Sequence, residues 1–363
     1  MSVVIEASRA RAAVALGGAR YDAVMAGLCG VFQAGAYLDL WAHVHRPELE
    51  TFFTPWHAVL YSGFLAVAVG TAVPMALRRP PAVSWSKALP AGYDLSLVGV
   101  LVFFLGGVLD MLWHTVFGVE ADVEALLSPS HLVLALGSTL MLTGPLRAAW
   151  RRTTSAGASW PAVLSLTYLL SSLTFWTQYA HQLGRPWPAS GNRPTSAVFA
   201  VVAPDPLFRG IEIQSVFVAH ALGVASILLQ AALLAGVVLL ALWRWGSALP
   251  AGTFTVLCGL NALMVGVARD QYALVPPAIA AGIVIDVLVR RLRPSRARPL
   301  SFRVVAFGAP AVYFALFFWT LGITRGLWWS VPLWSGAIVL AGIAGWLLSW
   351  LLLPPPVPAD EGR

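Results

Sequence analysis

The chain has 363 residues, of which 58% are hydrophobic and only 11% are charged, and its mean hydropathy is +0.76. A soluble globular domain carries about 25% charged residues, so this composition excludes a soluble enzyme and indicates a polytopic membrane protein. The formal net charge is +7, but no basic patch with interleaved aromatic residues occurs, so nucleic-acid binding is not expected. Cys29 and Cys258 lie far apart inside apolar segments and predict neither a disulfide framework nor a thiolate metal site.

A transmembrane helix needs about 20 mostly apolar residues, and about ten segments of the chain meet this requirement. We therefore expect an all-α fold, an integral membrane bundle of about ten transmembrane helices. The expected spans are approximately residues 22–43, 55–77, 94–116, 129–149, 160–182, 214–243, 251–269, 271–290, 302–323 and 332–353.

The distribution of charge predicts how this bundle is oriented. With the N-terminus inside, most of the Lys and Arg residues fall in cytoplasmic loops, which predicts a cell-membrane protein with both termini in the cytoplasm. We expect a four-helix unit at 1–155 and a six-helix unit at 156–363. The second unit would carry a long outer loop at 185–213 and a disordered, Pro-rich C-terminal tail.

Two similar motifs stand out in the first unit. Residues 39–57 read DLWAHVHRPELETFFTPWH, and residues 110–131 read DMLWHTVFGVEADVEALLSPSH. Each motif contains an acid, a His four residues later, a short loop, and then a hydroxyl residue, Pro, one spacer and a second His. Helix positions i and i+4 share a face, so the acid and the first His of each motif point the same way.

The hydroxyl-Pro pairs predict where the next helices begin. Thr54 and Ser128 are typical N-cap residues, and the Pro after each is typical of the first helical position. The second His of each motif then lies in the first turn of the following helix, and a helix hairpin brings each triad together. The two hairpins have the same orientation, so they would form a tandem parallel repeat. The expected triads are Asp39, His43 and His57, and Asp110, His114 and His131.

Ionisable groups in apolar surroundings are costly unless they are paired or coordinated, so each triad predicts a metal site. The alternative is a hydrogen-bonded Asp–His pair that fixes helix packing. Imidazole and carboxylate ligands suit copper, iron or zinc, and three protein ligands leave positions open for a substrate. Whether the copies make two sites or pool into one stays open at this stage.

All seven histidines fall at the outer ends of spans or in outer loops, so we expect the His clusters to face outward. His45 is expected to be solvated, with an outer-shell role at the first triad as the alternative. His181 and His220 flank the long outer loop and either form an additional site or line an outer cavity. Asp286 precedes Arg290 by four residues and is expected to pair with it, with a proton relay as the alternative.

The first motif, D-x3-H followed by T-P-x-H, resembles the C subunit of the copper membrane monooxygenases, the particulate methane and ammonia monooxygenases. The second motif resembles a later stretch of the same subunit, and together they cover roughly residues 30–145. The resemblance implies copper at both triads, with Glu120 as a neighbouring acid, and partners such as other oxygenase subunits or a cupredoxin-type redox protein. The chain departs from that family at Asp110, where the family has Asn, in the spacing between the histidines, and in six additional spans.

Three functions are compatible with this pattern. The protein is a membrane oxidase or monooxygenase-like enzyme acting on a small apolar substrate, a non-catalytic metal-handling protein, or a transporter with a His-rich outer vestibule. The sequence does not decide whether it is an enzyme.

Overall fold

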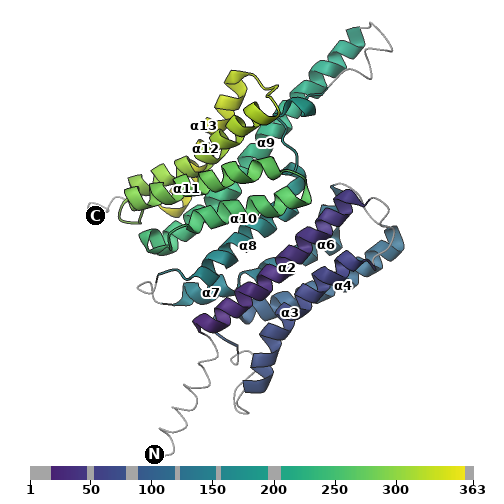
Figure 1. Cartoon of the computed structure of the whole chain (residues 1–363), viewed down its shortest axis with the longest axis vertical. Helices are drawn as coiled ribbons and strands as arrows, with labels where there is room; N and C mark the ends of the chain where they lie inside the picture. Colours follow the sequence, from purple (N-terminus) through teal and green to yellow (C-terminus); the bar gives the residue numbers. More distant parts are fainter. Residues whose placement is uncertain are drawn as a thin grey trace, which may run out of the picture. The chain divides into compact units, whose positions relative to one another are not determined.

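The protein is described by a computed structural model that covers residues 18–46, 53–78, 89–118, 123–152, 157–194 and 206–355, with the backbone alone at 206–214. Within these ranges every extended regular element is a helix, which confirms the predicted all-α fold (Figure 1). Glu120, the tail and the middle of the loop at 185–213 lie outside the described residues.

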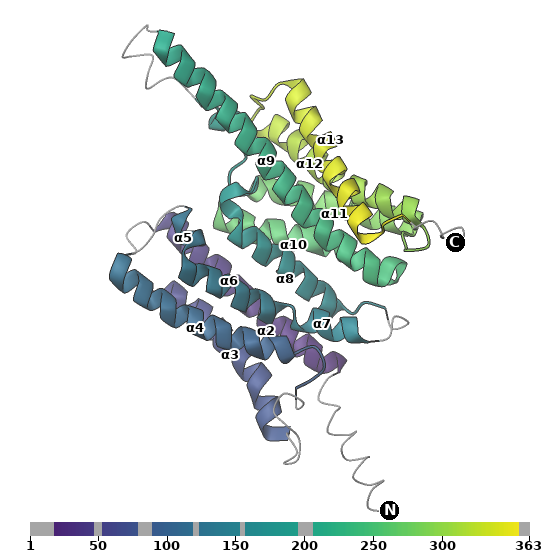
Figure 2. The same ribbon diagram turned by 180° about the vertical axis from the view of Figure 1, so that it is seen from behind.

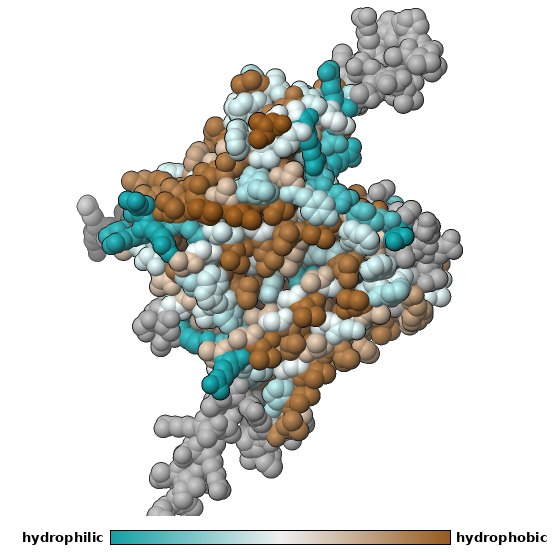
Figure 3. Space-filling model, in the orientation of Figure 1, coloured by the Kyte–Doolittle hydropathy of each residue, from teal (hydrophilic) through white to brown (hydrophobic). Residues whose placement is uncertain are grey.

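Seven of the described helices are long and apolar enough to cross a bilayer, which fits a multi-pass membrane protein. An eighth span results if α6 (Pro129–Leu142) and α7 (Gly144–Arg151), which are bent by 42° relative to each other, count as one broken span. Large apolar side chains such as Leu101, Phe104 and Leu65 are exposed on these helices, and Figure 3 shows apolar residues along their outward faces. The seven helices are α2 (Ala19–His45), α3 (Pro55–Arg78), α4 (Asp94–Phe117), α9 (Pro206–Trp245), α11 (Val275–Leu292), α12 (Pro299–Thr324) and α13 (Val331–Leu352).

The described residues do not reach the expected count of about ten spans, for local reasons at three segments. The span expected at 129–149 is broken at Thr143. The spans expected at 160–182 and 251–269 are the 17-residue α8 (Trp160–Trp176) and the 16-residue α10 (Thr253–Ala268). A rise of 1.5 Å per residue makes these helices about 24–26 Å long, shorter than the hydrocarbon core of about 30 Å.

The helices form two compact units. The first unit comprises residues 1–179 and 260–272, and the second comprises residues 180–259 and 273–363. The sequence alone placed this boundary at residue 155. Because α8 packs against α2, it belongs to the first unit, and α10 begins in the second unit and ends in the first.

Two helix pairs build most of the first unit, α2 with α3 and α4 with α6 (Figure 2). Glycine allows each pair to approach closely: a Cβ at Gly63 would lie 2.7 Å from Cα of Phe32, and one at Gly137 would lie 2.6 Å from N of Phe103. Phe32 and Phe103 pack edge to face, with ring centroids 5.1 Å apart, and join the two pairs at the core. The buried core of this unit is formed by Met25, Cys29, Phe32, Phe64, Val67, Tyr93, Val100, Phe103, Leu134, Met141, Leu142, Ala148 and Tyr168.

In the second unit, Asp286 of α11 has a different partner from the one expected. Its carboxylate accepts hydrogen bonds from the backbone N–H groups of Phe254 (3.2 Å) and Thr255 (2.9 Å) and from the Thr255 hydroxyl (2.7 Å). These are the first N–H groups of α10, which have no partner within their own helix. Asp286 therefore caps α10 from a neighbouring helix, and the predicted ion pair with Arg290 is wrong.

We predict that Gly137→Ala lowers the free energy of unfolding by about 1–3 kcal/mol, because the added methyl group collides with the α4 backbone. The matched control is Gly236→Ala in α9, where a Cβ meets nothing within 4 Å. Alanine is the better helix former by about 1 kcal/mol, so the control should be neutral or more stable. Denaturant unfolding in detergent measures both, and a Gly137→Ala variant as stable as the control contradicts the close packing of α4 on α6.

Candidate metal centre

The first triad lies where α2 ends and α3 begins. Nε2 of His43 lies 3.6 Å from Oδ2 of Asp39, and Nε2 of His57 lies 3.4 Å from the same oxygen. Asp39 and His43 are one turn apart on α2, whereas His57 is in the first turn of α3. The Thr54 hydroxyl accepts the backbone N–H of His57 at 3.1 Å, which confirms the predicted N-cap that fixes the start of this helix.

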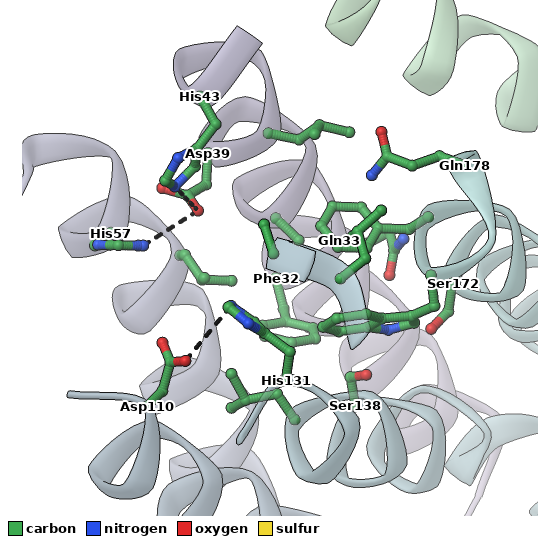
Figure 4. Close-up of a pocket in the computed structure, with 18 of the residues that line it drawn as sticks. Phe32, Gln33, Asp39, His43, His57, Asp110, His131, Ser138, Ser172 and Gln178 are labelled. Atoms are coloured by element: carbon green, nitrogen blue, oxygen red, sulfur yellow. Dashed lines mark ion pairs between the residues drawn. The ribbon is translucent and has the colours of Figure 1, made fainter. Parts of the chain in front are cut away.

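The second triad has matching dimensions at the end of α4 and the start of α6. Nε2 of His114 and Nε2 of His131 each lie 3.5 Å from Oδ1 of Asp110. The ring centroids of the two histidines are 5.8 Å apart, compared with 5.6 Å between His43 and His57. Figure 4 shows Asp39 facing His57, and Asp110 facing His131, at the edge of one pocket.

These separations fit shared coordination of an ion better than direct hydrogen bonds. An N–H···O hydrogen bond spans 2.7–3.2 Å, which is shorter than all four distances. Ligand atoms about 2.0–2.1 Å from a tetrahedral ion are about 3.4 Å apart, close to the observed spacing. In each triad the three ligand atoms lie within 4.8 Å of one another. The chemistry and geometry of both donor sets therefore fit a metal ion.

Hydrogen bonds around the second triad orient its imidazoles. Nδ1 of His114 lies 3.0 Å from the carbonyl oxygen of Gly118 and donates its proton there, because a carbonyl only accepts. On the neutral ring, Nε2 then presents a lone pair to Asp110. A lone pair facing a carboxylate is repulsive unless a cation or a proton lies between them, so this arrangement fits a metal ligand.

Two serines complete the surroundings of the second triad. The Ser130 hydroxyl donates to Oδ1 of Asp110 at 2.9 Å, and the Ser128 hydroxyl lies 2.7 Å from Nδ1 of His131. The two hydroxyls are 3.3 Å apart, so a chain of polar contacts leads from His131 back to Asp110. Ser128 stands at the N-cap position, followed by Pro129 as predicted, but its side chain makes no capping hydrogen bond to the helix. The contacts of these two serines with the triad were not predicted, and the spacing S-P-S-H is the sequence signal that points to them.

The first triad has different surroundings. Trp56 stands where the second motif has Ser130, and its ring packs edge to face on Trp41, with centroids 5.6 Å apart. Oδ1 of Asp39 is buried and has no hydrogen-bond partner among the described residues. A buried carboxylate oxygen without a partner is costly, so this atom too fits a ligand or neighbour of a bound cation.

The remaining predicted histidines do not join the triads. Nδ1 of His45 lies 2.8 Å from the carbonyl oxygen of Trp41, and Nε2 lies 2.6 Å from Oδ2 of Asp270. Both partners only accept, so His45 donates from both nitrogens and is a charged partner of Asp270, neither simply solvated nor a ligand.

In the second unit, His181 is fully buried and its Nδ1 accepts the backbone N–H of Leu183 at 3.2 Å. His220 stacks on Trp328 with ring centroids 4.4 Å apart. Within the described ranges, neither residue belongs to a group of three or more ligands that can hold a metal ion. The additional site suggested for this pair is therefore not found there.

Both triads line one cavity of about 540 Å³ in the first unit. The sequence left open whether the two motifs form two sites or one. In the structure they form two separate donor sets that line the same cavity. Phe32, Phe103 and Trp176 form apolar walls of this space. Tyr61, Gln178 and Arg269 also line the cavity, and they were not predicted because they belong to no sequence motif.

No protein-family model, curated protein or solved structure matches the chain.

We predict that Ser130→Ala weakens metal binding at the second triad about tenfold, since loss of an outer-shell hydrogen bond costs 10–100-fold in affinity. Competition with a chelator measures the affinity. Ser62→Ala is the control, because the Ser62 hydroxyl bonds only the carbonyl oxygen of Ala58 in its own helix. Equal affinities in the two variants would show that Ser130 does not tune the site.

We also predict that acid destabilises the second unit through His181. Burial lowers the pKa of His181 to about 3, whereas an unfolded His has a pKa of about 6.5. Between these values the unfolded state binds more protons, so stability is present above pH 6.5 and falls as the pH drops below it. The slope from this residue approaches about 1.4 kcal/mol per pH unit. His181→Gln should flatten the unfolding free energy between pH 6.5 and 5, and an unchanged slope contradicts the assignment.

Proposed function

We propose that this protein is a multi-pass membrane metalloprotein that binds copper at two Asp–His–His sites. Iron and zinc are the alternative metals. The observation that carries the proposal is that two triads of matching dimensions, from four different helices, line a single cavity. One Asp–His pair that fixes helix packing would not require a second imidazole, and would not require the arrangement twice.

The donor atoms support copper without a thiolate. Imidazole nitrogens suit copper, zinc and iron, and both cysteines are buried in their helices and belong to neither triad. The resemblance of the two motifs to the copper membrane monooxygenases favours copper among these metals. Bound copper would supply one-electron and O₂ chemistry, and the protein would supply the ligands, their orientation and the cavity.

We infer that the protein is an oxidase or monooxygenase-like component acting on a small substrate within the shared cavity. The volume of about 540 Å³ is in the range of small-molecule sites. Asp39 and Asp110 are buried and each faces two imidazoles at 3.4–3.6 Å, and aromatic side chains form part of the cavity wall. Such an enzyme would need an electron donor, which would be a cupredoxin-type protein or another oxygenase-like subunit.

The proposed placement follows from the charge distribution. Both termini would lie in the cytoplasm of a cell-membrane protein, and both triads would lie near the outer face. The two motif-bearing hairpins, α2–α3 and α4–α6, would be a tandem repeat about an axis along the membrane normal.

One observation favours the second candidate, a non-catalytic metal-handling protein. The His43 side chain is 39% exposed, whereas the His114 side chain is only 10% exposed. An exposed ligand permits exchange of the ion with a carrier, which suits delivery or storage. Turnover of a substrate by the metal-loaded protein distinguishes the two functions.

We predict that the purified protein binds about two metal ions per chain when copper is supplied, one for each triad. His57→Ala and His131→Ala should each remove about one ion, and the double variant should remove both. Each single substitution removes one of the three proposed ligands of a triad, and two remaining ligands would not hold an ion tightly. Elemental analysis after incubation with copper, zinc, iron or no metal measures the stoichiometry.

The matched control is His45→Ala, which removes a histidine two residues from His43 that bonds Asp270. It should retain both ions. Protein that carries no metal under any condition overturns the proposal, and double variants with full occupancy show that the ligands lie elsewhere.

A further inference from the structure

The cavity shared by the two triads has a third polar region that the metal sites do not explain. It is formed by Gln178, in a short 3-10 turn after α8, and by Arg269, which follows α10. Both residues belong to the first unit, like the triads. Gln178 is buried, with only 3% of its surface exposed, and its amide is drawn at the edge of the cavity in Figure 4.

Arg269 fixes the orientation of the Gln178 amide. Its Nε and Nη2 atoms both donate to Oε1 of Gln178, at 2.9 and 2.6 Å. A guanidinium group has no acceptor, so the oxygen of the amide must face Arg269 and the nitrogen must face away from it. The amide therefore has one orientation rather than two, and Figure 4 shows its nitrogen turned toward the cavity.

The Gln178 nitrogen has no acceptor within the described part of the chain. A buried amide nitrogen has two N–H donors, and leaving them unpaired is destabilising. The protein holds these donors in place with two hydrogen bonds to the oxygen of the same amide. Such an arrangement would stabilise the acceptor atom of a ligand that enters the cavity and reaches Nε2 of Gln178.

The charges around the cavity indicate what kind of acceptor this is. Four charged side chains are among its described lining residues, and the two carboxylates, Asp39 and Asp110, both belong to the triads. The other two are Arg46 and Arg269. The nearby acid Asp270 bonds His45 and does not line the cavity. The wall outside the triads thus presents a buried neutral donor next to positive charge, which favours an anionic oxygen.

The rest of the cavity is apolar. Phe32, Leu60, Phe103 and Trp176 are among its other lining residues. A ligand that fits both parts has an oxyanion at one end and a short apolar body.

We propose that the cavity binds a small organic carboxylate, with its carboxylate on Nε2 of Gln178 beside Arg269 and its apolar body directed toward the triads. As an assignment of the substrate class, this rests on the proposed function, but the binding itself depends only on the cavity. The carboxylate source is either a water-soluble acid or a fatty acid from the bilayer, because both present the same head group.

Binding of 4,4,4-trifluorobutyrate to the full-length protein, followed by fluorine NMR, tests the proposal. The neutral control ligand is 4,4,4-trifluorobutan-1-ol, which has a similar apolar body and no carboxylate. We expect the carboxylate to bind at least about tenfold more tightly than the alcohol, since a charge-assisted hydrogen bond is stronger than a neutral one. Equal binding of the two ligands, or no binding of either, overturns the proposal.

The decisive variant is Gln178→Glu. Glutamate has the same shape and still accepts from Arg269, but it replaces the donor nitrogen with a carboxylate oxygen that repels the ligand. Carboxylate affinity should fall at least about tenfold while alcohol binding is unchanged. Gln271→Glu is the matched control, because it adds the same charge two residues after Arg269 at a position that does not line the cavity. Loss of affinity in the control but not in Gln178→Glu places the ligand elsewhere and overturns the proposal.

The titrations are run on metal-free and copper-treated protein, with metal content measured in parallel. If the wild-type protein binds the carboxylate without binding metal, the proposed function fails and the carboxylate site stands. If the wild-type protein binds metal but shows no preference for the carboxylate, the carboxylate site fails and the proposed metal-binding function stands. Competition with acids of increasing chain length, from acetate to decanoate, identifies the source. Affinity that keeps rising with length indicates a fatty acid, and affinity that falls beyond a short chain indicates a soluble acid.

Discussion

Two carboxylates buried among apolar helices set the constraint on which the first unit depends. Asp39 and Asp110 are both buried, and neither has an Arg or Lys partner among the ion pairs of the described residues. Taking a carboxylate out of water costs several kcal/mol even after relaxation, unless a compensating charge is close by. Here each carboxylate is faced by two imidazoles at 3.4–3.6 Å. These groups compensate for burial only with a proton or a metal cation among them, so the fold requires a positive charge at both places.

Helix ends provide the geometry that meets this requirement. In each hairpin, two triad residues come from the last turns of one helix and the third from the first turn of the next, so a short connection brings them together. The glycines between the helices allow backbones to approach within contact distance, which keeps the three side chains in reach of one another. Each triad is thus held by two helices, and the positions of its side chains depend on the close packing of those helices at Gly63 and Gly137.

Local patterns predicted most of this arrangement. The i, i+4 spacing of acid and histidine, together with the hydroxyl-Pro pairs at Thr54 and Ser128, was enough to predict both triads and the helices that carry them. Periodicity and hydropathy failed where span length depends on tertiary structure, as at Thr143, where the chain bends, and in the short helices α8 and α10. Asp286 shows the same limit: Arg290 lies four residues away in sequence, but Asp286 bonds the first N–H groups of α10, which are distant in sequence. The Gln178–Arg269 hydrogen bonds could not be predicted from the sequence, because the two residues are 91 positions apart and belong to no motif.

The two triads share ligands and dimensions but not their surroundings. Asp110 accepts a hydrogen bond from Ser130, whereas Trp56 occupies the same motif position beside Asp39, whose second oxygen has no partner in the described part of the chain. The hydrogen bond from Ser130 orients the Asp110 carboxylate, and the aromatic neighbour Trp56 lowers the local polarity around Asp39. Identical ions placed in these two positions would therefore differ in affinity and in reduction potential. The difference between Trp56 and Ser130 would give two bound ions an order of filling and a preferred direction for electron flow, without changing any residue of the triads.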